Sequence, residues 1–388
     1  MLNFNYYTPT RLLFGQNSID NLANVLAEFG KNVLLTYGGG SIKKIGLYDE
    51  VIKRLKDFNV YELKGIEPNP KYTQSVVPGV NICKEKKIDV ILSVGGGSVL
   101  DCSKAIASAV FYDGEPWDIL TKKVMPTKAL PIVDIITLAA TGSEYDNGCV
   151  ISRPETNDKF GYGNDLLFPK VSILDPRYTF SVSKMQTAAG CADAMNHVFE
   201  QFFVANSTIL NDGMMIACLN SLMVNVKKAL VNPEDYNARA ELLYDSSLAC
   251  NGIFSNGSGP ENWPMHAIEH ALSAYYDITH GVGLAIITPR WMEYILNDET
   301  VDRFYILGRD LFKFNENDKF KMAHMVIDEF YKFFEDINIP MHLKEVGIDE
   351  SRLSEMAHHI HVNDHLDWSY AFHSLDEEDI LNILKKSL

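Results

Sequence analysis

Between residues 31 and 175, short apolar runs alternate with longer amphipathic segments, and this alternation constrains the fold more than any other feature of the sequence. The apolar runs predict strands at 31–37, 59–63, 90–94, 131–138 and 171–175, and the intervening segments predict helices at 47–58, 75–86 and 98–110. Regular strand–helix alternation is typical of a parallel sheet with helices on both faces. We therefore expect an α/β domain in this half of the chain.

The pattern changes near residue 183, because apolar residues then recur every three or four positions. This spacing predicts helices at 188–204, 211–230, 235–254, 266–275, 324–336 and 376–384. Few segments in this half have the alternation expected of a strand. The sequence thus predicts two domains, an α/β domain at 1–180 and an all-α domain at 181–388.

Net charge and composition indicate which kinds of binding partner and which cellular compartment to expect. A formal net charge of −16 disfavours binding to phosphate backbones and anionic lipids, so we expect neither a nucleic-acid nor a membrane partner. The six cysteines form no C-x-x-C pair, which favours reduced thiols in a reducing compartment. The first residues, Met1 to Asn5, have no basic region followed by an apolar core, so we expect no signal peptide, and no apolar run approaches the ~20 residues that span a bilayer. A soluble, cytoplasmic protein is expected.

Three turns follow predicted strands and carry glycine. Gly95, Gly96, Gly97 and Ser98 lie between a strand and a helix, where unpaired backbone N–H groups can bind phosphate. Ser98 and Asp101 have the spacing of a capping pair that would fix the start of this helix. A tight turn without a ligand remains the alternative, since the motif is not G-x-G-x-x-G.

The turn Gly38, Gly39, Gly40 and Ser41 also follows a strand. Dinucleotide sites that select NAD often have an acidic residue after the second strand, which binds the ribose hydroxyls. Glycine stands here instead, with Lys43 and Lys44 nearby, and this favours the 2′-phosphate of NADP; a plain turn with solvated lysines is the alternative. A third turn, Thr141 to Glu144 (TGSE), completes a credible ligand crevice at one edge of the sheet.

Metal-ligand residues are concentrated in the second half. Asp193 and His197 are four residues apart in a predicted helix, so both lie on one face, and His266 and His270 share this spacing. His280 follows where we expect a helix to end. One carboxylate and three imidazoles suit zinc or ferrous iron, although Asp/His pairs at this spacing are more often surface pairs.

A second group of histidines lies near the end of the chain: His358, His359, His361, His365 and His373. The segment is polar and has no acidic residue at a fixed spacing. We interpret it as a solvated segment rather than a metal site.

Four motifs together resemble the iron-containing (group III) alcohol dehydrogenases. They are GGGS at Gly95 with Asp101, ATGSE at Ala140, AAGCADAMNH at Ala188 and HAIEHALSAYYDITHGVG at His266. The YGGGS, EPNP and HGVGLAIITPRWMEYIL segments are most similar to the NADP-dependent butanol dehydrogenase branch. The segment 362–372 departs from the usual tail of the family.

This resemblance implies an N-terminal α/β dinucleotide-binding domain, an all-helical metal-binding domain and an active site in the cleft between them. The implied metal ligands are Asp193, His197, His266 and His280. The implied cofactor-binding residues are Gly38, Gly39, Gly40, Ser41, Asn69, Gly95, Gly96, Gly97, Ser98, Asp101, Thr137, Thr141, Lys159 and Tyr178. A homodimer is also a family expectation.

The implied reaction is hydride transfer between NADP(H) and small aliphatic alcohols or aldehydes such as butanol and butanal, assisted by Fe²⁺, Zn²⁺ or another divalent metal. His270 is the candidate catalytic proton relay; a packed or supporting histidine is the alternative. An NAD-linked polyol dehydrogenase of the glycerol or diol type, a dehydroquinate synthase and a non-catalytic nucleotide or metal sensor are the competing interpretations.

Overall fold

The computed structural model describes residues 1–364, 366 and 372–388, and these form two compact units. The sheet unit comprises Tyr7–Val182 and Asn232–Asn251, and the helical unit comprises Met1–Tyr6, Ser183–Val231 and Gly252–Leu388. The change near residue 183 coincides with the change of sequence pattern. The predicted domains 1–180 and 181–388 differ from these units in two segments: Met1–Tyr6 belongs to the helical unit and Asn232–Asn251 to the sheet unit. The predicted domain boundaries therefore stay a prediction.

A six-stranded parallel sheet forms the centre of the sheet unit, in the order β1-β8-β5-β4-β2-β3. Its strands are β1 (Arg11–Phe14), β2 (Asn32–Tyr37), β3 (Asn59–Lys64), β4 (Val90–Gly95), β5 (Ile132–Ile136) and β8 (Val171–Leu174). The chain adds β3 outside β2, returns to β4 and then continues to the opposite side. The carboxyl ends of β2 and β4 thus meet where the strand order reverses, which is the usual ligand position in such sheets.

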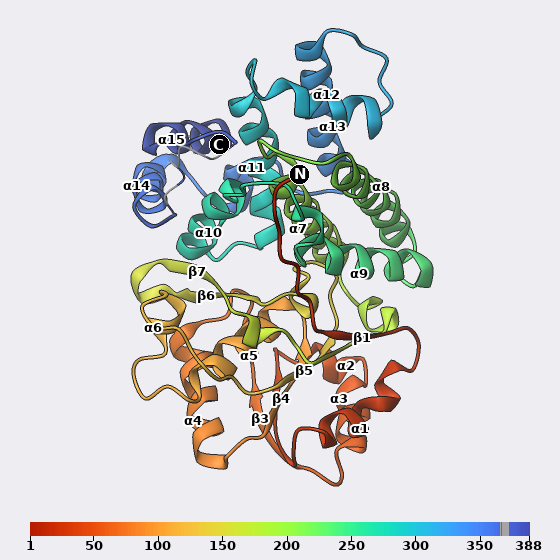
Figure 1. Cartoon of the computed structure of the whole chain (residues 1–388), viewed down its shortest axis with the longest axis vertical. Helices are drawn as coiled ribbons and strands as arrows, with labels where there is room; N and C mark the ends of the chain where they lie inside the picture. The colour runs from red at the N-terminus through yellow and green to blue at the C-terminus, as the bar shows by residue number, and fades with distance from the viewer. Residues whose placement is uncertain (365, 367–371) are drawn as a thin grey trace. The chain divides into compact units, whose positions relative to one another are not determined.

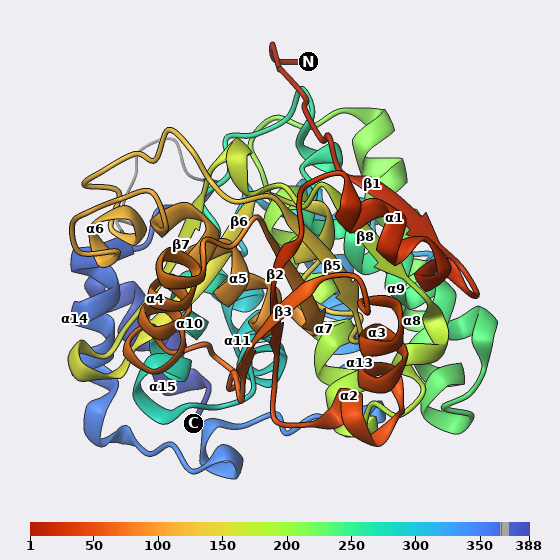
Figure 2. The ribbon, with the colours of Figure 1, turned by 90° about the horizontal axis from the view of Figure 1, so that it is seen from below.

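Helices cover both faces of this sheet, as Figures 1 and 2 show. On one face α4 (Val77–Lys86) and α5 (Gly97–Ala109) bury residues such as Val80 and Ile106, and on the other α1 (Leu22–Ala27) and α3 (Leu47–Arg54) bury Leu26 and Val51. Central strands such as β4 are buried along their whole length. Burial on both faces explains why these strands are continuous apolar runs rather than alternating ones. The predicted parallel sheet is confirmed.

Several elements of the sheet unit differ from the expectation. Strand β1 and an antiparallel hairpin of β6 (Gly148–Arg153) and β7 (Asp158–Gly163) were not predicted. The helix expected at 75–86 begins with a π-helical turn, η2 (Tyr72–Val76), before α4. The unit also contains α2 (Ser41–Lys44), α6 (Trp117–Leu120) and α9 (Tyr236–Cys250).

The helical unit contains no strand among its described residues, which confirms the all-α expectation. Its helices are α7 (Lys184–Phe202), α8 (Ile209–Val231), α10 (Pro264–Tyr276), α11 (His280–Ile295), α12 (Val301–Asp310), α13 (Lys319–Asp336), α14 (Leu353–Asp364) and α15 (Glu377–Lys386). α11 packs along α7, and both are buried over most of their length. The expected helix end at His280 is wrong, because α11 begins there with Thr279 as its N-cap.

Within the described part of the chain, α8 alone is long and apolar enough to cross a membrane by length and composition. Core helices of soluble proteins meet the same criterion, and α8 packs against α7 through buried residues such as Met215 and Leu222.

Candidate metal and nucleotide sites

Four side chains predicted as metal ligands come together in the helical unit. Asp193 and His197 project from α7, His266 from the first turn of α10, and His280 is the first residue of α11. The Nε2 atoms of His197, His266 and His280 lie 3.4, 3.8 and 3.5 Å from Oδ1 of Asp193. The three imidazoles therefore point at one carboxylate oxygen.

The separations of 3.4 and 3.5 Å match ligands that share a metal ion, and that of 3.8 Å is slightly longer. Metal bonds of about 2.0–2.2 Å in a tetrahedron separate neighbouring ligand atoms by roughly 3.3–3.6 Å. Asp193 Oδ1 and His266 Nε2 are buried and have no hydrogen-bond partner in the described structure, which is costly unless a cation satisfies them. Ligand atoms of Asp193, His266 and His280 all lie within 4.8 Å of one another. The donor set fits a divalent first-row metal.

Two buried glutamates orient the histidines. Nδ1 and the backbone N–H of His266 lie 3.2 and 3.0 Å from Oε1 of Glu200, and Nδ1 of His280 contacts Glu269. A carboxylate on one imidazole nitrogen fixes the ring so that the other nitrogen faces the metal. Glu200 and Glu269 were not predicted, although each follows a predicted ligand by three residues: His197 and His266 both begin an H-x-x-E motif.

Electrostatics around the four residues favours a bound cation. Burial raises the pKa of Asp193, but the adjacent histidines outweigh it and leave the pKa well below its usual value. Burial lowers the pKa of His197 to about 3, so that imidazole is neutral, as metal ligation requires. Burial also disfavours the charged form of His266, but Asp193 and Glu200 raise its pKa to about 9, so this imidazole must release a proton when it binds a metal.

His270 lies beside this group. Its ring centroid is 5.6 Å from that of His280 and 6.3 Å from that of His266. Glu269, His270 and His280 form a second set of ligand atoms within 4.8 Å of one another. The structure thus brings His270 close to the predicted ligands.

Three of the C-terminal histidines contact residues other than the predicted metal ligands. His358 pairs with Glu377 at 2.9 Å, the His359 ring packs edge-on against Tyr275, and Nδ1 of His373 lies 3.4 Å from Nδ2 of Asn297. His365 lies outside the described residues, as does most of the segment 362–372 that departs from the family.

Replacing Glu200 or Glu269 by glutamine should weaken metal binding about 10–100-fold, because the imidazole it contacts loses its orienting carboxylate. Glu377→Gln is the matched control, since Glu377 also contacts a histidine Nδ1 but on α14 and α15. Competition with a chromophoric chelator measures the affinity. Equal affinity in all three variants would contradict an orienting role.

The predicted nucleotide-binding residues gather at one edge of the sheet unit. Gly38 follows β2, Gly96 and Gly97 start α5 after β4, and Thr137 follows β5, with its N–H donated to Gly95 O at 2.9 Å. These strands are neighbours, so their carboxyl ends are adjacent. A Cβ at Gly97 would lie 2.4 Å from Oγ1 of Thr141, which requires glycine there.

The capping role predicted for Ser98 and Asp101 is wrong. The N-cap of α5 is Gly96, without a side-chain bond, and Val99 N–H donates to its carbonyl oxygen. Asp101 instead accepts bonds from Ser143 Oγ at 2.7 Å and Val150 N–H at 2.9 Å. The Asp101 carboxylate therefore stabilises the turn from Thr141 to Glu144.

Lys104, which was not predicted as a site residue, stabilises the same turn. Its buried ammonium donates to the carbonyl oxygens of Ser143 and Gly148 at 2.7 and 2.8 Å and to Oδ1 of Asp146 at 2.7 Å. A buried lysine with this many acceptors keeps its charge, and its pKa is raised by Asp146 and Asp101 despite burial.

The structure also describes the surroundings of three other predicted cofactor-binding residues. Asn69 has a left-handed backbone, with φ 48°, and Lys159 is buried in β7. The hydroxyl of Tyr178 lies 3.3 Å from Oε2 of Glu50. The structure leaves their contacts with a nucleotide as predictions.

Family models match nearly the whole chain. Residues 9–176 match the model for iron-containing alcohol dehydrogenase, and residues 187–388 match the C-terminal model of the Fe-containing alcohol dehydrogenase family. The chain belongs to the iron-containing alcohol dehydrogenase family. It is accordingly an alcohol dehydrogenase, an oxidoreductase that uses a nicotinamide cofactor.

Full-length relatives agree with this assignment. The chain is 46% identical to NADH-dependent butanol dehydrogenase A of Clostridium acetobutylicum, covering 100% of both chains. It is 36% identical to the NADPH-dependent aldehyde reductase YqhD of Escherichia coli over 91% of each. The crystal structure of NADH-dependent butanol dehydrogenase A from Thermotoga maritima matches with a TM-score of 0.96 and 35% identity, covering 100% of this chain and 99% of that one.

Proposed function

We propose that this chain interconverts small aliphatic aldehydes and alcohols such as butanal and butanol, with NADP(H) and a divalent metal held by Asp193, His197, His266 and His280. The convergence of three Nε2 atoms on Asp193 Oδ1, at 3.4–3.8 Å, carries the metal part of this proposal. Iron is the expected metal from the family, and the same donors accept zinc.

When bound, the metal supplies a Lewis acid for the substrate oxygen, and the nicotinamide supplies or accepts the hydride. The chain's own contribution is positioning. Glu200 and Glu269 hold two imidazoles in the ligating orientation, and the apolar surroundings of α7 and α11 exclude water. A cleft between the domains as the place of reaction stays a prediction.

A steady-state panel tests the function. Enzyme loaded with one metal at a time is assayed with NADPH and NADH against butanal, shorter aldehydes, 1,3-propanediol and glycerol. We expect the highest kcat/KM with butanal. Preference for glycerol or the diol would favour a polyol dehydrogenase, and nucleotide binding without turnover of any substrate would favour a sensor.

The cofactor proposal rests on the turn after β2, since the relatives include both NADH- and NADPH-dependent proteins by name. The nearby acid, Glu62, accepts bonds from the hydroxyls of Tyr37 and Tyr48 at 2.6 and 2.8 Å. Burial raises its pKa, but these two donors outweigh burial and lower it. Lys43 lies over both tyrosine rings, at 5.1 and 4.5 Å, and its positive charge favours a 2′-phosphate.

Gly39→Asp should raise the KM for NADPH and leave the KM for NADH unchanged. A Cβ at Gly39 meets nothing within 4 Å, whereas one at Gly38 would lie 3.2 Å from the carbonyl oxygen of Ile66. Charge repulsion with the 2′-phosphate of about 1.4 kcal/mol corresponds to a roughly tenfold higher KM for NADPH. Gly39→Asn is the uncharged control of similar size. An unchanged KM for NADPH in the aspartate variant contradicts this placement of the phosphate.

His270 is proposed as the proton relay. His270→Gln should lower kcat by about 10²-fold while metal content stays unchanged, as expected for loss of a general acid–base group. Metal analysis by mass spectrometry accompanies the kinetics. Loss of metal together with kcat would make His270 a ligand beside Glu269 and His280, and unchanged kcat would end the relay proposal.

A cytoplasmic location and a homodimer are also proposed. Five of the six cysteines are buried and none of the six forms a disulfide, which suits a reducing compartment. Sedimentation equilibrium at several concentrations tests the dimer.

A further inference from the structure

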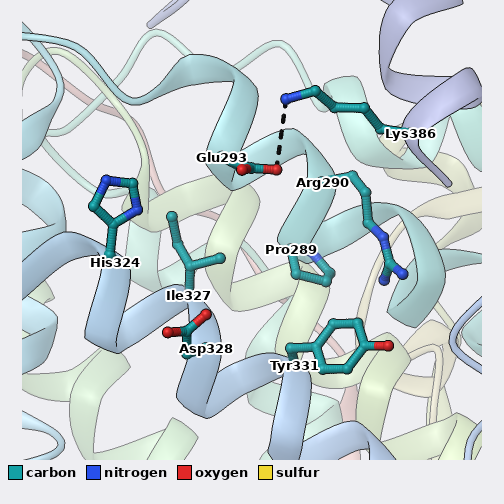
Figure 3. Close-up of a pocket in the computed structure, with 8 residues that line it drawn as sticks. All are labelled: Pro289, Arg290, Glu293, His324, Ile327, Asp328, Tyr331 and Lys386. Carbon is teal, nitrogen blue, oxygen red and sulfur yellow. Dashed lines mark ion pairs between the residues drawn. The ribbon is translucent and has the colours of Figure 1, made fainter.

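A pocket of about 340 Å³ lies in the helical unit between α11, α13 and the end of α15. In Figure 3, Arg290, Tyr331 and Lys386 lie on one side of it and His324 and Asp328 on the other. Arg290 is ten residues from His280 on the same helix, or about 15 Å along its axis, so this pocket is separate from the metal-ligand group. Its volume is within the range of small-molecule sites.

Arg290 is the unusual member of this pocket. The residue is 7% exposed, and burial lowers its pKa, although a guanidinium remains charged in proteins. Its Nη1 donates to the carbonyl oxygen of Ile286 at 3.3 Å, and its Cζ lies 4.8 Å from the centre of the Tyr331 ring. Within the described residues it forms no ion pair with a carboxylate, and Glu293 and Glu335 act on it only at longer range. A buried charge without a counter-ion is costly.

The other charged groups of the pocket are at its rim. Lys386 pairs with Glu293 at 3.5 Å, but both side chains are about half exposed, and such pairs contribute little and exchange readily. Lys386 can therefore turn to a ligand near Arg290. Asp328 is exposed and would repel a second negative charge. This arrangement favours a ligand with a single anionic group.

We propose that this pocket binds a small molecule through one carboxylate or phosphate group, which contacts Arg290 and Lys386. Guanidinium groups bind both anions through paired hydrogen bonds, so the shared chemistry is a compact oxyanion. The rim acids Glu293 and Asp328 exclude polyanions. Of the four Lys, Arg, Asp and Glu side chains that line the pocket, only that of Arg290 is buried.

Calorimetric titration with inorganic phosphate and, separately, propionate tests the proposal. The metal-loaded enzyme is first saturated with dinucleotide, so that the glycine turns of the sheet unit are filled, and ionic strength is held constant. We expect saturable binding of one equivalent with a dissociation constant on the order of 1 mM. Tighter binding of phosphate identifies a phosphorylated ligand, and tighter binding of propionate a carboxylate. No saturable binding of either probe overturns the proposal.

Arg290→Met should weaken binding at least tenfold. Arg352→Met is the matched control, because Arg352 also lies over a tyrosine ring, at 4.2 Å from Tyr275, but is paired with Glu355. If Arg290→Met does not fold, the affinity of Lys386→Met for the same probes tests the proposal, because this exposed residue can be replaced without disturbing the core. A threefold or larger loss of affinity in Lys386→Met supports the site, and unchanged affinity contradicts it.

Discussion

Asp193→Ala should remove the bound metal and reduce kcat/KM by roughly 10³-fold or more. Asp193 Oδ1 is the atom on which His197, His266 and His280 converge, and its loss removes the carboxylate that the three imidazoles share. Loss of the Lewis acid removes several kcal/mol of transition-state stabilisation, and about 4 kcal/mol corresponds to 10³-fold. Metal content and steady-state kinetics of the purified variant check both parts.

Asp212→Asn is the control for this experiment. Asp212 is also a carboxylate of the helical unit, and it forms an ion pair with Arg303 at 2.7 Å away from the histidines. It should retain metal and turnover, whatever it loses in stability. A metal-free Asp193→Ala enzyme with full activity would falsify the ligand assignment, and metal loss in both variants would point to a general effect on folding.

Strands β2, β4, β5 and β8 could be predicted because they are buried on both faces. Such strands are uninterrupted apolar runs, and the glycine turns and amphipathic helices between them mark their ends. Strand β1 was missed because it is a short edge strand, and the β6–β7 hairpin because its sequence mixes polar residues and glycine. Strand β1 also depends on pairing with the distant β8, which a local pattern does not contain, whereas β6 and β7 pair with each other.

Helix α11 was not predicted because its own sequence disfavours a helix. Its sequence contains Gly281, Gly283 and Pro289, all of which have low helix propensity. Burial against α7 outweighs that propensity. The error mattered for the site, because His280 was expected at the end of a helix and instead begins one.

The metal-ligand residues were only partly predictable from spacing. Asp193 and His197 share a helix face at four residues apart, as do His266 and His270, so spacing alone favoured His270 as much as His280. The packing of α11 on α7 brings His280 to 3.5 Å from Asp193. The resemblance to the family supplied His280, whereas Asp101 was misinterpreted because its partners, Ser143 and Val150, are remote in sequence.

Gly281→Ala should destabilise the helical unit and weaken metal binding together. A Cβ at Gly281 would lie 1.9 Å from the carbonyl oxygen of Ala189 and 2.6 Å from its carbonyl carbon, both backbone atoms of α7. No side-chain rotation can relieve this clash, so α11 must move away from α7. Overpacking of this kind costs about 3 kcal/mol. The glycine next to His280 is thus required by the close approach of two helices.

The same displacement moves the first residue of α11, His280, away from Asp193, and we expect metal affinity to fall about 100-fold or more, by analogy with the loss of an orienting contact. Gly213→Ala is the matched control, because this glycine also lies within a helix but a Cβ there meets nothing within 4 Å. It should leave stability unchanged or raise it by up to about 1 kcal/mol. Urea unfolding of the apo-protein and metal titration separate the two effects. Normal stability and affinity in Gly281→Ala would show that α7 and α11 do not pack this closely, and the placement of His280 beside Asp193 would fail with it.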